Sequence, residues 1–263
     1  MQPDTRMKAL ILDMDGVLWR ESEPIGDLPR VFSWITTHNL DYILATNNAT
    51  KTPQKYQEKL ASFGVEIPLE KIINSAMAVA YLLKQRFPHG GGVYIIGENG
   101  LNEALAQAGF FPSDQDCIAV VASMDRGINF DKLKTATLLI RSGVPFYATN
   151  PDRTFPTPEG LIPGAGAIIG SLEISTDVAP IIAGKPNHTL YEFALERLGT
   201  SPAETLVIGD RIETDIQGAQ GLGCRTGLVL SGISTKEEAE NHQPPIDYIA
   251  ANLESLLQEL NGK

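Results

Sequence analysis

Short apolar runs alternate along the chain with longer stretches in which apolar residues recur every three or four positions. The first run is Lys8–Leu12, the helical spacing follows over 28–40, and the next run is Tyr42–Ala45. Continuous apolar runs of this length are typical of strands buried in a parallel sheet, and the periodic stretches are typical of helices that cover its faces. The pattern predicts an α/β fold with a doubly wound, Rossmann-like parallel sheet.

The next helix is predicted from Pro53 to about Phe63. Thr52 suits its N-cap, Pro53 suits the first helical position, and Gly64 supplies the C-terminal stop. After a further apolar helix around 76–86, the segment Pro88–Gly92 interrupts all regular structure.

A second β/α pattern then begins, with strands expected over 93–97, 117–121 and 144–149 and helices over 100–107 and 133–140. The loop 150–158 and the turn 163–166 are rich in Pro and Gly, so we expect them to be irregular. A helix over 190–198 and strands near 206–208 and 226–230 return to the first pattern. We therefore predict a core domain formed by 1–77 and 183–263, with a smaller α/β domain over 78–182 inserted into it.

Composition narrows the function. The 263 residues are 43% hydrophobic, which is enough for a sizeable core, and the formal net charge of −11 without a basic stripe argues against a nucleic-acid partner. Cys117 and Cys224 lie far apart, which favours reduced thiols. No signal-peptide core or membrane-length apolar run is present, so we expect a cytoplasmic protein without a membrane partner.

Two carboxylates, Asp13 and Asp15, follow the first predicted strand, and Gly16 permits a tight turn after them. Ligands of open α/β sheets bind just outside the carboxyl ends of strands. Side chains two residues apart on an extended chain share a face, and close like charges need a shared proton or a divalent cation. A solvated turn would account equally well for this short motif alone.

Other polar residues follow the neighbouring predicted strands. Thr46, Asn47 and Asn48 offer a hydroxyl and backbone N–H groups that can hold an anion, although a capping turn would use the same residues. Lys185 precedes the 190–198 helix, from which its ammonium can reach such a site. Asp210 and Asp215 follow the strand near 206–208, and they bring two more acids to the same edge of the sheet.

This ordered set resembles the haloacid-dehalogenase superfamily, and within it the NagD-like, para-nitrophenyl-phosphatase-like branch with a large inserted α/β cap. The resemblance covers essentially the whole chain. It is carried by the four motifs above and by three further segments, Ala148–Asp152, Pro163–Gly166 and Gly184–Pro186. Its local departure is Ala122–Arg126, where relatives more often have a Gly and an apolar residue ahead of the Asp-Arg pair.

The resemblance implies a Mg²⁺-dependent phosphatase that hydrolyses small phosphate monoesters through an aspartyl-phosphate. Asp13 is expected to be the nucleophile and Asp15 the general acid and base. Mg²⁺ is expected to be ligated by Asp13, the Asp15 carbonyl and Asp210. Asp215 is expected to orient a metal-bound water or Lys185 rather than to ligate the metal. The expected ligands of the phosphoryl group are Thr46, Asn47, Asn48 and Lys185.

We expect substrate specificity to reside in the inserted domain, chiefly in Asn150, Asp152, Arg153 and Phe155, because the core motifs handle only the phosphoryl group that all substrates share. The partner is then a small phosphate ester, and the sequence leaves open whether the chain forms a homo-oligomer. A receiver module is disfavoured because its phosphorylated Asp lies on a later strand. A catalytically silent binding protein on this fold, or a phosphomutase with a second phosphate site in the cap, stays open.

Overall fold

A computed structural model of the chain describes residues 7–157 and 159–261. It contains two compact units, each formed by non-contiguous segments. The first unit holds the chain up to Thr46, 54–73 and everything from Lys185 onward, and the second holds 47–53 and 74–184. Within the described ranges, no helix is long and apolar enough to cross a membrane.

The first unit is built on a six-stranded sheet with the strand order β15-β14-β13-β1-β4-β5. The pairings of β15 with β14, of β14 with β13, of β13 with β1 and of β1 with β4 are parallel. The strands are β1 (Ala9–Leu12), β4 (Asp41–Thr46), β5 (Ile72–Asn74), β13 (Thr205–Gly209), β14 (Arg225–Val229) and β15 (Tyr248–Ala250). The predicted α/β fold is confirmed.

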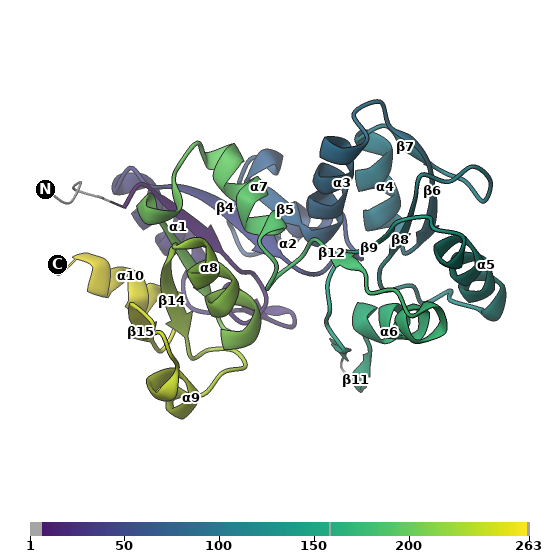
Figure 1. The fold of residues 1–263 in the computed structure, drawn as a ribbon. Helices are drawn as coiled ribbons and strands as arrows, with labels where there is room; N and C mark the ends of the chain where they lie inside the picture. The colour runs from purple at the N-terminus through teal and green to yellow at the C-terminus, as the bar shows by residue number, and fades with distance from the viewer. Residues whose placement is uncertain (1–6, 158, 262–263) are drawn as a thin grey trace, which may run out of the picture. The chain divides into compact units, whose positions relative to one another are not determined.

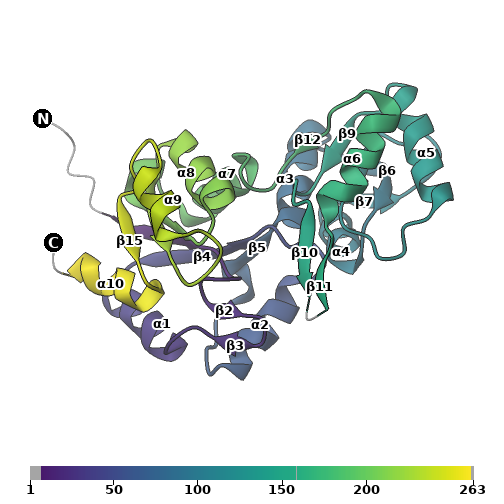
Figure 2. The same ribbon diagram turned by 90° about the horizontal axis from the view of Figure 1, so that it is seen from below.

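Helices cover both faces of this sheet (Figure 1, Figure 2). Leu10 and Leu12 point into a core shared with α1 (Leu28–Thr37), α2 (Pro53–Ser62) and α10 (Leu253–Asn261). On the other face, α7 (Thr189–Leu198) packs against β1 and β4, and α8 (Gln217–Leu222) packs against β14. The smaller elements are β2 (Trp19–Arg20), β3 (Glu23–Pro24), α9 (Lys236–Asn241), the 3₁₀ turns Leu69–Lys71 and Pro202–Glu204, and the π-helical turn Ile212–Ile216.

Strand β1 lies between β13 and β4 in the sheet, and this position determines where the site forms. Leu12 pairs with Leu44 of β4 on one side and with Ile208 of β13 on the other. The residues that follow these three strands therefore meet at one edge of the sheet, at the point where the strand order reverses. Asp13 and Asp210 are such residues, and Thr46 is the last residue of β4.

The second unit has its own parallel sheet with the order β12-β9-β8-β6-β7. Its strands are β6 (Gly91–Ile96), β7 (Phe110–Pro112), β8 (Ala119–Ala122), β9 (Phe146–Ala148) and β12 (Ile181–Ile182). Its helices are α3 (Ser75–Arg86), α4 (Asn99–Gln107), α5 (Phe130–Arg141) and α6 (Ala165–Thr176). Buried side chains of β8, β9, α5 and α6 form one hydrophobic core.

The expectation that 150–158 and 163–166 are irregular is wrong in part. Residues 150–153 and Gly164 form no helix or strand, as expected, and Pro158 lies outside the described residues, but the rest belong to regular elements. Residues Thr154–Thr157 (β10) and Gly160–Pro163 (β11) form an antiparallel hairpin, and α6 begins at Ala165. A two-stranded ribbon tolerates proline because each strand has an edge whose N–H groups need no partner. Phe155 and Ile162, which pair across the hairpin, pack against the core of the second unit and fix its position.

Two leucines on neighbouring helices of the second unit test this packing. Leu172 of α6 is fully buried, and Leu138 of α5 is 63% exposed. We expect Leu172→Ala to lower the free energy of unfolding by about 2–5 kcal/mol, because it removes buried methyl groups and leaves a cavity. Leu138→Ala should change it by less than about 0.5 kcal/mol. Hydrogen exchange of the β8 and β9 amides in urea measures the stability of this unit, and similar losses for the two variants would contradict the packing.

Candidate active site

Asp13 directly follows β1 and is buried at the edge of the sheet. Its backbone N–H donates a hydrogen bond of 2.8 Å to the Ile208 carbonyl, which extends the parallel pairing with β13 by one residue. The carboxylate is therefore held on a rigid strand end rather than on a loop.

Lys185 lies beside Asp13 and is 3% exposed. Its Nζ is 2.5 Å from Asp13 Oδ1 and 2.6 Å from Asp215 Oδ1, and it donates a third hydrogen bond of 3.2 Å to the Ala45 carbonyl. The ammonium therefore joins the ends of β1 and β4 to the segment after β13.

Asp210 follows β13 and is covered by the loop Ser231–Ser234. Its Oδ2 accepts the Ile233 N–H at 2.8 Å, and its carbonyl accepts the Ser234 N–H at 3.0 Å. A Cβ on Gly232 would collide with the Asp210 carboxylate, and a Cβ on Gly16 would lie 2.6 Å from Asp210 Oδ2. These two glycines let backbone approach the acid from both sides.

Asp215 lies in the π-helical turn Ile212–Ile216, and both of its carboxylate oxygens have partners. Oδ1 pairs with Lys185, and Oδ2 accepts the Arg211 N–H at 3.1 Å. The hydroxyl of buried Tyr191 donates to the carbonyls of Thr214 and Asp215, at 2.9 and 3.1 Å. Tyr191 thereby fixes the turn that aims Asp215 at Lys185.

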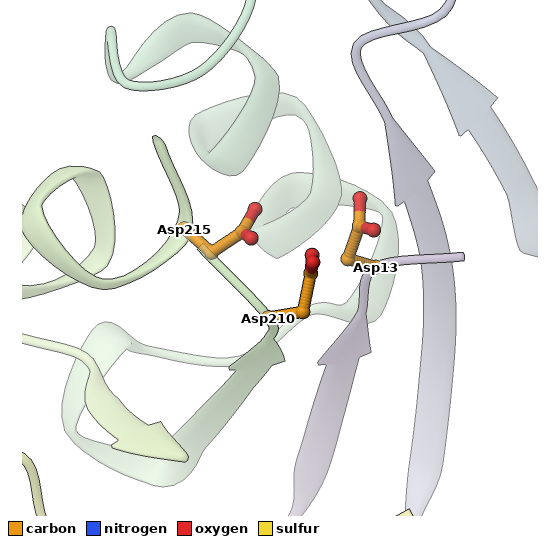
Figure 3. Close-up of side chains that lie close together, drawn as sticks. All are labelled: Asp13, Asp210 and Asp215. Atoms are coloured by element: carbon orange, nitrogen blue, oxygen red, sulfur yellow. The ribbon is translucent and has the colours of Figure 1, made fainter. Parts of the chain in front are cut away.

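The carboxylates of Asp13, Asp210 and Asp215 converge (Figure 3). Each offers an oxygen, and these oxygens all lie within 4.8 Å of one another. When all three carboxylates are ionised, they carry two negative charges in excess of the single ammonium of Lys185, at a buried place. Carboxylate oxygens with this charge balance suit a hard divalent cation such as Mg²⁺.

The pKa values of these groups reflect the crowding. Burial, together with the charges of Asp215 and Asp210, raises the pKa of Asp13 well above its usual range, although Lys185 opposes the shift. Burial and the charge of Asp215 raise the pKa of Asp210 to about 6. Burial lowers the pKa of Lys185, but Asp13 and Asp215 outweigh it and the pKa is raised. Lys185 is therefore a permanent cation.

Asp15 differs from the other acids because its side chain is exposed. Its Oδ1 accepts a hydrogen bond of 2.7 Å from the indole N–H of Trp19. An exposed carboxylate two residues after a buried one on the same strand end can exchange protons with ligands and water.

The structure distributes the predicted phosphate-binding residues over both units. Thr46 ends β4 in the first unit, is buried, and makes a side-chain hydrogen bond with Tyr56. Asn47 and Asn48 belong to the second unit. Asn48 Oδ1 accepts hydrogen bonds from the N–H and hydroxyl of Thr50, at 3.0 and 2.7 Å.

The residues predicted to set specificity all lie in the second unit. Asn150 is buried, and its amide donates to the Asn47 carbonyl at 2.8 Å. The Asn47 amide in turn donates to Asp152 Oδ2 at 3.4 Å. Phe155 is partly buried with the Arg126 guanidinium 5.8 Å from its ring centroid, and Arg153 is exposed. Of the four side chains, Arg153 is thus the most accessible.

A buried polar network in the second unit accounts for the position of Asn150. The Asn47 carbonyl accepts hydrogen bonds from Asn150 and from the Ser75 hydroxyl, and the Thr149 carbonyl accepts the Gly184 N–H at 2.6 Å. Asn47 and Gly184 are residues at which the chain passes from one unit to the other. The network fixes the backbone of these crossing points within the second unit, and Asn150 is buried because it belongs to this network.

The residues that support the site residues through hydrogen bonds were not identified from the sequence. Trp19, Tyr56 and Tyr191 are buried aromatic residues whose polar atoms face Asp15, Thr46 and the Asp215 turn. The sequence offered one signal for Trp19, its position four residues after Asp15. Tyr56, Tyr191 and the Ser231–Ser234 loop reach the site only through the fold.

The sheet is parallel and carries a buried Asp–Lys–Asp cluster after its central strands. This combination is typical of hydrolases that transfer phosphoryl groups. Models of haloacid dehalogenase-like hydrolases match residues 10–111 and 182–256. The chain belongs to this hydrolase family, in the branch that includes NagD.

Three relatives illustrate the similarity. An acid sugar phosphatase of Staphylococcus aureus is 35% identical over 254 residues, which cover 96% of this chain and 98% of that one. The structure of NagD from E. coli K-12 has a TM-score of 0.88 and 30% identity, and covers 94% of this chain and 97% of its own. A glycerol phosphate phosphatase from Mycobacterium tuberculosis, in complex with magnesium, has a TM-score of 0.88 and 30% identity over 95% of this chain and 76% of its own.

The raised pKa of Asp210 predicts a pH-dependent stability in the presence of chelator. The folded protein resists ionisation of Asp210 until about pH 6, whereas the unfolded chain ionises near the ordinary value of 3.8. The contribution of Asp210 to the stability of the folded wild type should therefore fall as the pH rises from 4 through 6. Asp210→Asn, which stays neutral, should be more stable than wild type at pH 7.5, on the order of 1–3 kcal/mol, and the difference should vanish near pH 4.

Urea unfolding followed by tryptophan fluorescence measures this difference, because Trp19 and Trp34 both lie in the first unit. Asp114→Asn, which changes an exposed acid of the second unit, is the matched control. A gain that is the same at pH 4 and pH 7.5 would rule out an electrostatic origin.

Proposed function

We propose that the protein is a Mg²⁺-dependent phosphatase that hydrolyses small phosphate monoesters through an aspartyl-phosphate on Asp13. The observation that carries this proposal is the position of Asp13, buried beside Lys185 and within a cluster of two further acids at the sheet edge. The substrates named for its relatives, sugar phosphates and glycerol phosphate, support a small phosphate ester as the substrate.

Asp13 is the nucleophile of this proposal. Its Oδ1 is held by Lys185, so the carboxylate cannot rotate freely and presents its other oxygen to a phosphorus atom. Attack forms an oxygen–phosphorus bond to Asp13 and breaks the bond to the leaving alcohol. Water then cleaves the aspartyl-phosphate, which divides one difficult hydrolysis into two easier steps.

Asp15 is the general acid in the first step and the general base in the second. Its exposed carboxyl gives a proton to the leaving oxygen and later takes one from the attacking water. The Asp13 carboxylate is buried and paired with Lys185, so it is unsuited to this exchange and the two acids have separate roles.

The acids fit a bound Mg²⁺. Asp13, the Asp15 carbonyl and Asp210 would hold it, and when bound it would neutralise charge on the phosphoryl oxygens. Asp215 has both oxygens engaged by Lys185 and Arg211, which supports a role in orienting Lys185 rather than in direct ligation. The magnesium-bound relative supports the choice of metal.

Fixed donors receive the transferring phosphoryl group. The Thr46 hydroxyl and the Lys185 ammonium lie on the core, and the amide of Asn47 with the adjoining Asn48 follows on the chain. These donors stabilise charge that grows in the transition state, so the contribution of the protein is mainly positioning.

Specificity resides in the second unit, within which residues 78–182 serve as the cap domain. Asn150, Asp152, Arg153 and Phe155 are the residues proposed for it. The hairpin that carries Phe155 and directly follows Arg153 is anchored on a hydrophobic core, which gives a recognition surface a defined shape.

Phosphate release from p-nitrophenyl phosphate and from sugar phosphates tests the activity. We expect turnover with Mg²⁺ and none with excess chelator, because the acids repel a phosphate dianion when no cation is bound. Asp13→Asn should form no phosphoenzyme and lose at least about 10³-fold in kcat, since the residual catalysis rests on binding alone. Asp114→Asn should keep wild-type kinetics. Equal rates with Mg²⁺ and with chelator would refute the metal assignment.

Arg153→Ala tests the specificity role of the segment that leads into the hairpin. We expect kcat/KM to change unequally, by about tenfold on some esters of a phosphate panel, while the Mg²⁺ dependence survives, because Arg153 would contact the leaving group only. Arg86→Ala, an exposed arginine at the end of α3 in the same unit, is the control. A uniform effect on all esters would place specificity elsewhere.

A further inference from the structure

We propose that Trp19 is a positioning residue for Asp15, whose carboxylate it aims for proton transfer to the leaving alcohol. This inference rests on the proposed function. Trp19 has no titratable proton, so its effect must pass through Asp15.

The hydrogen bond between the two residues closes a tight turn. The Trp19 indole N–H donates to Asp15 Oδ1 at 2.7 Å, and the backbone N–H of Gly16 donates to the Trp19 carbonyl at 2.7 Å. The Leu18 N–H donates to the Met14 carbonyl at 2.8 Å. Trp19 is therefore held to the turn that carries Asp15 by both its main chain and its side chain.

The indole cannot move away from Asp15, because Trp19 is fully buried. Tyr56 stacks on it at a ring-centroid distance of 6.4 Å, and Phe63 packs at 6.2 Å. The Lys59 ammonium lies 4.1 Å from the centroid of the indole ring and donates to the Glu21 carbonyl at 2.7 Å. The donor is thus part of a rigid core, which is what a positioning group requires.

Asp15 itself has little else to fix it. Within the described part of the chain, the bond from Trp19 is the only hydrogen bond that the Asp15 carboxylate makes, and the side chain is exposed. Without the indole N–H, the carboxylate would sample several rotamers in water. The bond occupies Oδ1 and leaves Oδ2 to carry the proton that the leaving oxygen receives.

The leaving-group dependence of kcat/KM tests the proposal, because this parameter reports the first phosphoryl transfer and not the later hydrolysis of the phosphoenzyme. Glycerol phosphate has a poor leaving group that needs the proton from Asp15, and p-nitrophenyl phosphate has a good one that does not. General acid catalysis typically contributes 10²–10⁴-fold. We expect Trp19→Phe to lower kcat/KM about tenfold or more on glycerol phosphate and less than about threefold on p-nitrophenyl phosphate.

The chain supplies a matched control in Trp34, its other tryptophan. Trp34 lies on α1, and its indole nitrogen has no hydrogen-bond partner among the residues that the structure describes. Trp34→Phe should leave kcat/KM on both esters within about twofold of the wild-type values. In an Asp15→Asn background, Trp19→Phe should cause no further loss on glycerol phosphate, because the group that it positions is already gone.

A spectroscopic measurement covers the case in which Trp19→Phe folds poorly. In spectra of ¹⁵N-labelled protein, the Trp19 indole N–H resonance of Asp15→Asn should be shifted from its wild-type position, and that of Trp34 should stay in place. Replacing Trp19 by benzothienylalanine, which keeps the ring shape and lacks the N–H, should reproduce the kinetic pattern of Trp19→Phe.

The outcomes separate the two claims. A wild-type protein that is inactive on both esters would overturn the proposed function, and the positioning role with it. The positioning role alone would be overturned if the wild type is active and Trp19→Phe lowers kcat/KM equally on both esters. It would also be overturned if the loss of kcat/KM caused by Trp19→Phe adds to the loss caused by Asp15→Asn. An unchanged Trp19 resonance in Asp15→Asn would also overturn it.

Discussion

The ion pairs of Lys185 with Asp13 and Asp215 are the interaction on which the site depends. A buried ammonium between two buried carboxylates gains Coulomb energy that counteracts the desolvation of these groups, and removing one partner leaves an uncompensated charge. Because the third hydrogen bond of Lys185 goes to the Ala45 carbonyl, the same side chain also ties the end of β4 to the end of β1. The geometry around Asp13 is therefore set by electrostatics as much as by packing.

The remaining acids are arranged around that pair by backbone. Asp210 receives the Ile233 N–H, and Asp215 receives the Arg211 N–H, so each carboxylate has a fixed orientation before any ligand binds. Burial, and then the charge of Asp215, which is fixed nearby, raise the pKa of Asp210 to about 6. A divalent cation would relieve this repulsion, so the repulsion among the acids and their affinity for a metal have the same origin.

Much of the fold and of the site was predictable from the sequence. The buried strand ending in Asp13 and the strand ending in Gly209 and Asp210 were evident, because short apolar runs that stop at an acid are typical of buried parallel strands with a polar end. The family resemblance was confirmed, since ordered motifs spaced over the whole chain are far more specific than any one of them. Strand Thr154–Thr157 was wrongly expected to be part of a loop, because local composition cannot show that Phe155 and its hairpin partner Ile162 pack on a distant hydrophobic core.

The tertiary structure alone decided how the acids differ. Asp13 and Asp15 are two residues apart and look equivalent in sequence, yet one is buried against Lys185 and the other is exposed and bonded to Trp19. The roles of Tyr56 and Tyr191 were equally invisible, because each hydroxyl meets a segment that is remote from it in sequence or that reads as an ordinary turn. The sequence determines which residues reach the sheet edge, since strand order and polarity fix that. Burial and charge, which shift each pKa and orient each carboxylate, depend on contacts among β1, β13, α7 and the Ser231–Ser234 loop that only folding creates.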